Sequence, residues 1–169
     1  MNDLLILAML LPGPKYGYQL KREAGWIFGQ ESLHNNIVYP TLRRFLEQEW
    51  VSKKAVPGER GQTRQQYALT AAGRRSLFER LSLFSEDDAS SDEAFNLRVG
   101  LFPALKADIR EAILDKREAF LRQRDQKLET MLARMDVGKF GGEVVGHLRK
   151  QTEADLEWVL HLRRLVKNL

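Results

Sequence analysis

The chain has 169 residues, of which 43% are hydrophobic and 30% charged, and this balance predicts a packed soluble fold. It has no cysteine, which excludes disulfides, thiolate metal sites and a cysteine nucleophile. The net charge is +4 and is uneven, because residues 1–82 hold 12 Lys and Arg against 7 Asp and Glu, whereas residues 83–169 hold 15 against 16. A basic half of this kind suits a phosphate-rich partner, although an acidic protein would also fit it.

Two helices are predicted in the first 26 residues. The first, about residues 3–11, is apolar on nearly every side, which predicts burial. Its apolar run is too short to span a bilayer and lacks a basic leader, so a cytoplasmic protein without membrane contact is expected. Pro12-Gly13-Pro14 ends this helix, and the second runs from about residue 16 to residue 25 or 26.

The third predicted helix is amphipathic. It begins near residues 35–39, because Pro40 has no N–H to donate and fits in or near a first turn. Val38, Leu42 and Phe45 recur at helical spacing on its apolar side. Polar residues on the other side can enter a DNA major groove, where Asn suits adenine and Arg suits guanine. The candidate contacts from this helix are Asn35, Asn36, Tyr39, Thr41, Arg43 and Arg44.

A β-hairpin follows, with strands at residues 51–57 and 64–69 joined by a loop that contains Gly58 and Gly61. Thr70 can then cap a fourth helix that runs to about residue 84. Three helices followed by a basic hairpin are the order of a winged helix-turn-helix, in which the hairpin tip reaches the DNA backbone. The alternative is a small α/β domain whose arginines are merely solvated. The candidate contacts from the hairpin are Arg60, Gln62, Thr63 and Arg64.

The second half of the chain predicts helices throughout. The polar, acidic residues 85–92 are interpreted as a linker between a DNA-binding domain, residues 1–84, and a helical domain, residues 93–169. Ser90 and Glu93 have the spacing of a capping box that opens a short helix. Two long helices are then predicted at residues 105–135 and 143–169, with a glycine-bearing turn at residues 136–142.

Both long helices carry apolar residues at heptad intervals, so that the fold class is mainly α with one small hairpin. Asp155 interrupts the stripe on the last helix. A single helical hairpin cannot cover two wide stripes, which favours a homodimer in an antiparallel coiled-coil-like arrangement. The alternative is that the stripes pack only on each other and on the first helix. The predicted dimerisation residues are Leu114, Leu121, Leu128, Val145, Leu148, Val159, Leu162 and Val166.

Three segments resemble the PadR family of bacterial transcriptional regulators, in its longer subfamily with a virulence-activator-like C-terminal domain. They are Gly13-Pro14-Lys15-Tyr16-Gly17-Tyr18-Gln19-Leu20, Tyr39-Pro40-Thr41-Leu42-Arg43-Arg44-Phe45, and the run from Arg64 to Gly73. The resemblance implies a homodimer that binds double-stranded DNA at a pseudo-palindromic operator and represses transcription. It also implies that a small aromatic effector releases the DNA. Candidate residues for its pocket are the aromatic side chains near the predicted linker, with one histidine: Phe84, Phe95, Phe102, Trp158 and His161. The competing interpretation is that these side chains only pack the core.

Nothing in the sequence indicates catalysis. His34, His147 and His161 lie far apart without metal-ligand spacing, and there is no phosphate-binding glycine motif or nucleophile elbow. The chain is therefore expected to have no catalytic residues, no metal and no cofactor. Beside the DNA-binding regulator, two hypotheses from other classes remain: a helical adaptor that uses its winged helix for protein contact, and a small-molecule sensor.

Overall fold

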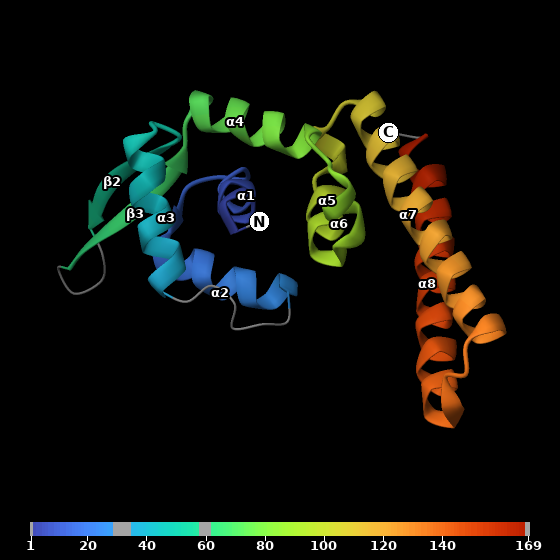
Figure 1. The fold of residues 1–169 in the computed structure, drawn as a ribbon. Helices are drawn as coiled ribbons and strands as arrows, with labels where there is room; N and C mark the ends of the chain where they lie inside the picture. Colours follow the sequence, from blue (N-terminus) through green and yellow to red (C-terminus); the bar gives the residue numbers. More distant parts are fainter. Residues whose placement is uncertain (1, 29–34, 58–61, 168–169) are drawn as a thin grey trace. The chain divides into compact units, whose positions relative to one another are not determined.

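The structure is a computed structural model that describes residues 2–28, 35–57 and 62–167. It is mostly helical with one small sheet, and the chain divides into two compact units, Met1–Leu83 and Phe84–Leu169 (Figure 1). Within the described ranges, no helix has the length and apolar character that crossing a bilayer requires.

The first unit is a winged helix assembled around α1 (Asn2–Met9). After Asn2 and Asp3 this helix is apolar on all sides, and it is buried because it packs against three further helices among the described residues of the unit. Those helices are α2 (Gly17–Phe28), α3 (Asn35–Glu47) and α4 (Ala71–Ser82). The apolar side of α3 faces the same core, since Val38, Leu42 and Phe45 are buried as their helical spacing predicts.

The sheet of this unit has three antiparallel strands in the order β1-β3-β2. The predicted hairpin is confirmed as β2 (Val51–Pro57) and β3 (Thr63–Leu69), which pair from Val51 opposite Leu69 to Pro57 opposite Thr63. The sequence did not predict β1 (Lys15–Tyr16), which pairs with the other edge of β3. Two residues are too few to show an alternation of polar and apolar side chains, so the signal for a strand was missing.

The turn after α3 and the start of α4 are locked together. Glu49 adopts a left-handed φ of 56°, and the Trp50 N–H donates to the Phe45 carbonyl at 2.9 Å, which closes α3. Thr70 caps α4 as predicted, because its Oγ1 accepts a hydrogen bond from the Gly73 N–H at 3.0 Å. The same hydroxyl donates to the Glu49 carbonyl at 2.7 Å. Thr70 thus connects the end of β3 and the start of α4 to the end of α3.

The second unit contains α5 (Glu86–Ser90), α6 (Asp92–Val99), the short 3-10 helix η2 (Phe102–Ala104), α7 (Ala107–Arg134) and α8 (Gly138–Val166). Residues 85–92 were predicted to be a linker, and this prediction is corrected: most of the segment is helical, and it belongs to the second unit. Its charged residues supply the capping box, which joins Ser85 and Asp88 rather than Ser90 and Glu93, and Ser91 caps α6.

The turn between the two long helices is shorter than predicted. α8 begins at Gly138, five residues before the expected start, so that Gly141 and Gly142 are helical. Gly138 itself has a φ of +61°, a conformation that favours glycine and explains why a residue without a side chain stands at this corner. The glycines therefore marked the position of the corner correctly but not its length.

The apparent flaw at Asp155 is an ion pair. Arg117 of α7, whose side chain is only 2% exposed, donates to Asp155 Oδ2 at 3.2 Å and to the Ala89 carbonyl at 2.8 Å. It also contacts the Asp92 carboxylate at the start of α6. Burial raises the pKa of the Asp155 carboxyl, and the positive charge of Arg117 acts against that shift. One buried guanidinium thus joins α5, α6, α7 and α8.

The predicted dimerisation residues are mostly buried within one chain. Leu114, Leu121 and Leu128 of α7 are buried, and so are Val145, Val159 and Leu162 of α8, while Leu148 and Val166 are half-buried. The two helices pack along their length, so these stripes cover each other. This corrects the expectation that they remain available for a second chain, and it favours the alternative in which they pair with each other.

Candidate nucleic-acid interface

One side of α3 is packed and the opposite side is open to solvent. Tyr39, Pro40, Arg43 and Arg44 are exposed, whereas the side that carries Val38 is buried. An exposed helix face in a winged helix can enter a major groove. Thr41 was expected on the exposed side, and this expectation is corrected: its exposed fraction is only 6%, and it faces the core. Asn35 and Asn36 form the first turn of α3, but their side chains lie outside the described part of the structure.

The two adjacent arginines of α3 differ in their contacts. Arg44 donates to Asp3 Oδ1 of α1 at 2.5 Å, so that an acidic side chain of the same unit already holds its charge. Arg43 is exposed, and among the described residues no partner forms a hydrogen bond or an ion pair with its guanidinium. Arg43 is therefore the guanidinium of α3 that can reach a ligand without breaking an existing ion pair.

The wing carries further basic and polar side chains. Gln62 and Thr63 are exposed near the hairpin turn, and Arg64 is half-buried at the start of β3. Arg60 lies outside the described residues. Lys53 and Lys54 were not among the predicted contacts, but both are exposed on β2, opposite Tyr67 and Gln66 of β3. Their signal was available, since two adjacent lysines in a basic unit indicate a phosphate contact.

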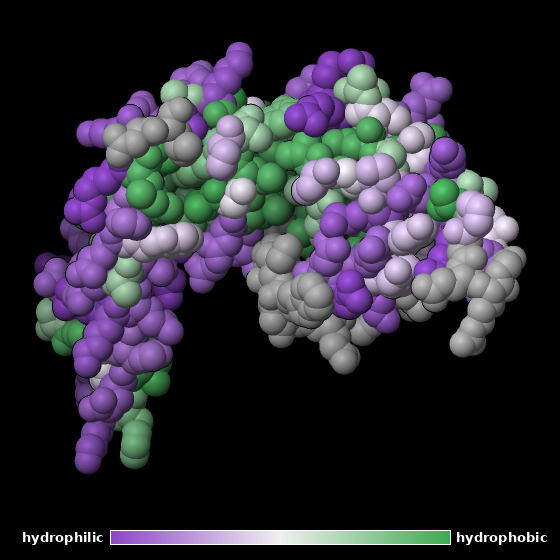
Figure 2. All heavy atoms as spheres, turned by 180° about the vertical axis from the view of Figure 1, so that it is seen from behind, coloured by the Kyte–Doolittle hydropathy of each residue, from purple (hydrophilic) through white to green (hydrophobic). Residues whose placement is uncertain are grey.

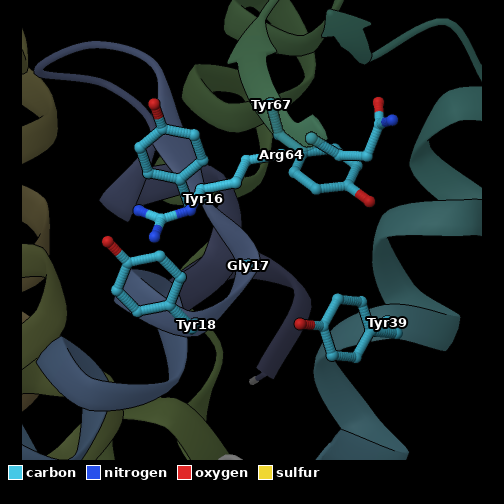
Figure 3. A pocket seen from close by; sticks show the side chains of 7 residues that line it. Tyr16, Gly17, Tyr18, Tyr39, Arg64 and Tyr67 are labelled. Atoms are coloured by element: carbon cyan, nitrogen blue, oxygen red, sulfur yellow. The ribbon is translucent and has the colours of Figure 1, made fainter. Parts of the chain in front are cut away.

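A pocket of about 530 Å³ opens between α3, β3 and the junction of β1 with α2 (Figure 3). All four tyrosines of the chain line it, although they come from three separate segments of the sequence. Tyr16 and Tyr18 stack with their ring centroids 5.7 Å apart and their planes at 10°. Only Tyr39 and Arg64 of this set were among the predicted DNA contacts. The lining residues are Tyr16, Gly17, Tyr18, Tyr39, Arg64, Gln65 and Tyr67.

Three of the aromatic residues proposed for an effector pocket, Phe84, Phe95 and Trp158, form a packed cluster in the second unit. Phe95 is fully buried, with its ring centroid 6.5 Å from Phe84 and 5.4 Å from Trp158, the latter edge-on. Phe102 is also buried, and His161 is exposed. Because Phe95 contacts both Phe84 and Trp158, a ligand would have to separate these rings in order to bind between them.

Comparison with known proteins shows what the first unit is similar to. Residues 6–79 match the transcriptional regulator PadR-like family. Bacillus subtilis PadR in complex with operator DNA is similar in structure at 20% identity, with 97% of this chain and 96% of that chain covered and a TM-score of 0.49. A PadR family transcription regulator from Clostridium difficile is 24% identical over 47% of this chain and 81% of that chain, with a TM-score of 0.42. A transcriptional regulator from Clostridium thermocellum is 22% identical over 46% of this chain and 76% of that chain, with a TM-score of 0.41. None of the curated proteins compared matches the chain.

Proposed function

We propose, from the premise that residues 6–79 belong to the PadR-like family of transcriptional regulators, that this protein is a dimeric, sequence-specific DNA-binding repressor. The observation that supports this function most directly is the open face of α3, where Arg43 is exposed beside the already paired Arg44. The basic excess of residues 1–82 lies in the same unit. It would attract the phosphates of a duplex and hold the unit on any sequence before bases are read.

In this proposal α3 lies in the major groove and the wing contacts the neighbouring backbone. Arg43 can donate two hydrogen bonds to the O6 and N7 atoms of one guanine, which is the commonest specific contact between a protein and a base pair. Arg44 has a structural task, because its ion pair with Asp3 ties the exposed side of α3 to α1. Lys53 and Lys54 would contact phosphates.

We expect Arg43→Ala to weaken binding to the preferred operator by about 1–3 kcal/mol, since it removes a bidentate base contact. Arg44→Ala should weaken binding less, because this guanidinium already pairs with Asp3. The measurement starts with selection of preferred fragments from genomic DNA. Affinities for a preferred and an unrelated duplex are then compared at several salt concentrations.

Arg44→Ala is the matched control, because it removes the same charge from the adjacent position of the helix. Both variants should retain the circular dichroism of the wild type, since both side chains are exposed. If Arg43→Ala binds the preferred operator as tightly as the wild type, α3 does not read bases through this residue. If the wild type binds all fragments alike and only at low salt, the protein is better described as an adaptor than as a regulator.

A dimer would place two copies of α3 on two half-sites of an operator. The apolar stripes of α7 and α8 cover each other within one chain, so the dimer contact must use another surface. The exposed face of α8 offers such a surface. Eight positions spaced alternately four and three residues apart are all exposed, as a heptad seam requires. These positions, which we call the outer stripe, are Phe140, Val144, His147, Gln151, Ala154, Trp158, His161 and Leu165.

The composition of the outer stripe favours burial against another helix. None of its eight residues is Asp, Glu, Lys or Arg, in a chain that is 30% charged. Phe140 is 83% exposed and Val144 is 58% exposed, which is costly for residues that face water. Figure 2 shows apolar atoms at the free end of the hairpin, set among hydrophilic ones. A partner helix would cover this surface.

The charges beside the outer stripe favour a second copy of α8 in antiparallel orientation. A two-fold axis between Gln151 and Ala154 would bring Phe140 of one chain opposite Leu165 of the other. The flanking positions 143, 150, 157 and 164 hold Glu, Lys, Glu and Arg. In this orientation residue 150 faces residue 157 and residue 143 faces residue 164, so each pairing joins opposite charges. The pattern is self-complementary, as a symmetric dimer requires.

An aromatic effector that releases the DNA is a further part of the proposal. Its support is the sequence resemblance together with the aromatic cluster of Phe84, Phe95 and Trp158. A planar ligand would bind there by separating the packed rings. We expect a phenolic acid that binds there to change tryptophan fluorescence and to release DNA in the same concentration range. Trp158→Phe should remove most of the fluorescence change, and a panel without any such compound would eliminate the effector.

A further inference from the structure

The lining of the pocket beside α3 offers hydrogen-bond donors and no negative charge. Of its seven residues, four are tyrosines, one is Arg64, and none is Asp or Glu. A neutral phenol donates one hydrogen bond and a guanidinium donates several. The neighbouring Lys15 does not contribute, because its ammonium pairs with Glu23 Oε2 at 2.6 Å. A lining of this kind favours a ligand that accepts several hydrogen bonds and carries negative charge.

The donors come from different elements and line two sides of the pocket. Figure 3 shows the Arg64 guanidinium beside the rings of Tyr16 and Tyr18, with Tyr39 and Tyr67 on the other side of the pocket. Burial, and secondarily Tyr39, raises the pKa of the Tyr67 phenol, so it stays protonated and remains a donor at neutral pH. A ligand in the pocket would thus contact α3 and the wing together.

Gly17 allows Tyr39 to approach. A Cβ on Gly17 would lie 2.8 Å from Cε1 of Tyr39, closer than real contacts allow, and 3.2 Å from its hydroxyl oxygen. Any larger residue at position 17 would therefore push the Tyr39 ring away from the first turn of α2. The position of the Tyr39 hydroxyl thus depends on the missing side chain of Gly17.

We propose that this pocket is an oxyanion site that takes a phosphate compound, with the Arg64 guanidinium on one side of the ligand and the hydroxyls of Tyr39 and Tyr67 on the other. The inference rests on the proposed function in one respect, since the DNA backbone is one source of the phosphate. The other source is a free phosphate compound. The pocket, at about 530 Å³, is larger than one phosphate and leaves room for the sugar or other group attached to it.

The first experiment tests the backbone source on the full-length protein. We expect Tyr39→Phe, which removes only a hydroxyl, to weaken binding to preferred and unrelated duplexes alike, by at least about fivefold. Arg64→Gln should also lower the salt slope of binding by about one. Arg75→Gln is the matched control, because it removes one charge from an exposed position of α4 outside the pocket and should change the affinity less.

Gly17→Ala distinguishes an effect on ligand binding from an effect on the stability of the fold. Alanine is a better helix former than glycine, so the melting temperature should stay the same or rise. Binding should nevertheless weaken, because the added methyl group displaces Tyr39. A merely structural role for Tyr39 would instead lower stability and binding together.

The second experiment titrates inorganic phosphate and phenyl phosphate into the wild type without DNA. Saturable binding that Tyr39→Phe and Arg64→Gln both weaken would support the site with a free compound as its source. Weakened duplex binding without any binding of the free anions would support it with the backbone as its source. If the wild type binds no duplex, the proposed function fails, and the anion titration alone decides the pocket. The inference is overturned if these variants bind both duplexes and free anions as the wild type does.

Discussion

Leu165→Asp is expected to convert the dimer into monomers while the fold of each chain persists. Leu165 is 49% exposed in one chain, so aspartate meets water there. In the proposed dimer the same carboxylate would be buried against Phe140 of the second copy, and this would occur twice. Burying an unpaired charge costs several kcal/mol, so the dissociation constant should rise by more than about 100-fold. Light scattering or sedimentation measures the mass, and circular dichroism reports the helices.

Leu160→Asp is the matched control for this prediction. Leu160 is 45% exposed on the same helix, but it lies outside the outer stripe, on a different side of α8. The variant should therefore remain a dimer and bind operator DNA. If both leucine variants remain dimers, the outer stripe does not form the interface. Val159→Asp does not test the interface, because Val159 is fully buried against α7 and its replacement would unfold the hairpin.

The charges beside the outer stripe test its orientation. Glu157→Lys would place two lysines opposite each other in the antiparallel dimer and weaken it, whereas Lys150→Glu combined with Glu157→Lys should restore the affinity. The two positions are seven residues apart on one helix, so they cannot rescue each other within a chain. A double variant as weak as the single one would contradict the antiparallel arrangement.

Gly73→Ala is expected to unfold the winged helix. A Cβ at this position would lie 2.0 Å from the Trp50 carbonyl oxygen and 2.8 Å from its carbon. Both atoms belong to the backbone of the turn that Thr70 holds, so they cannot move aside as a flexible side chain would. We expect a loss of more than about 3 kcal/mol in the free energy of unfolding of the first unit. DNA binding should be lost.

The second unit provides the control. Gly146 lies inside α8, and a Cβ there would meet no atom within 4 Å. Gly146→Ala should therefore stabilise this helix by about 0.5–1 kcal/mol, since alanine loses less backbone freedom on folding. Thermal melts followed by circular dichroism compare the two variants. A Gly73→Ala protein that melts at the wild-type temperature and still binds DNA would contradict the assigned turn.

Local patterns in the sequence were sufficient for the longer helices and the β-hairpin of this protein, but not for β1 or α5. The apolar spacing of Val38, Leu42 and Phe45 predicted which side of α3 is buried, and the structure confirms it. Thr70 was predicted as a cap and is one. These predictions succeed because helical periodicity, strand composition and capping involve residues only a few positions apart, so the physical cause lies within the segment itself.

Tertiary structure alone decided which residues are available for function. Arg43 and Arg44 are equivalent in the sequence, and only the approach of Asp3 from α1 pairs one and leaves the other open. Thr41, by contrast, lies three residues after Val38 and four before Phe45, so helical spacing already places it on the buried side. Four tyrosines from three segments meet in one pocket because β1 pairs with β3 and α3 packs beside the same sheet. On α8, the sequence has two sets of residues at heptad spacing, the buried stripe and the outer stripe. Only the position of α7 determines which of them is covered within the chain. Contacts between distant segments depend on how elements pack, and no local pattern records that packing.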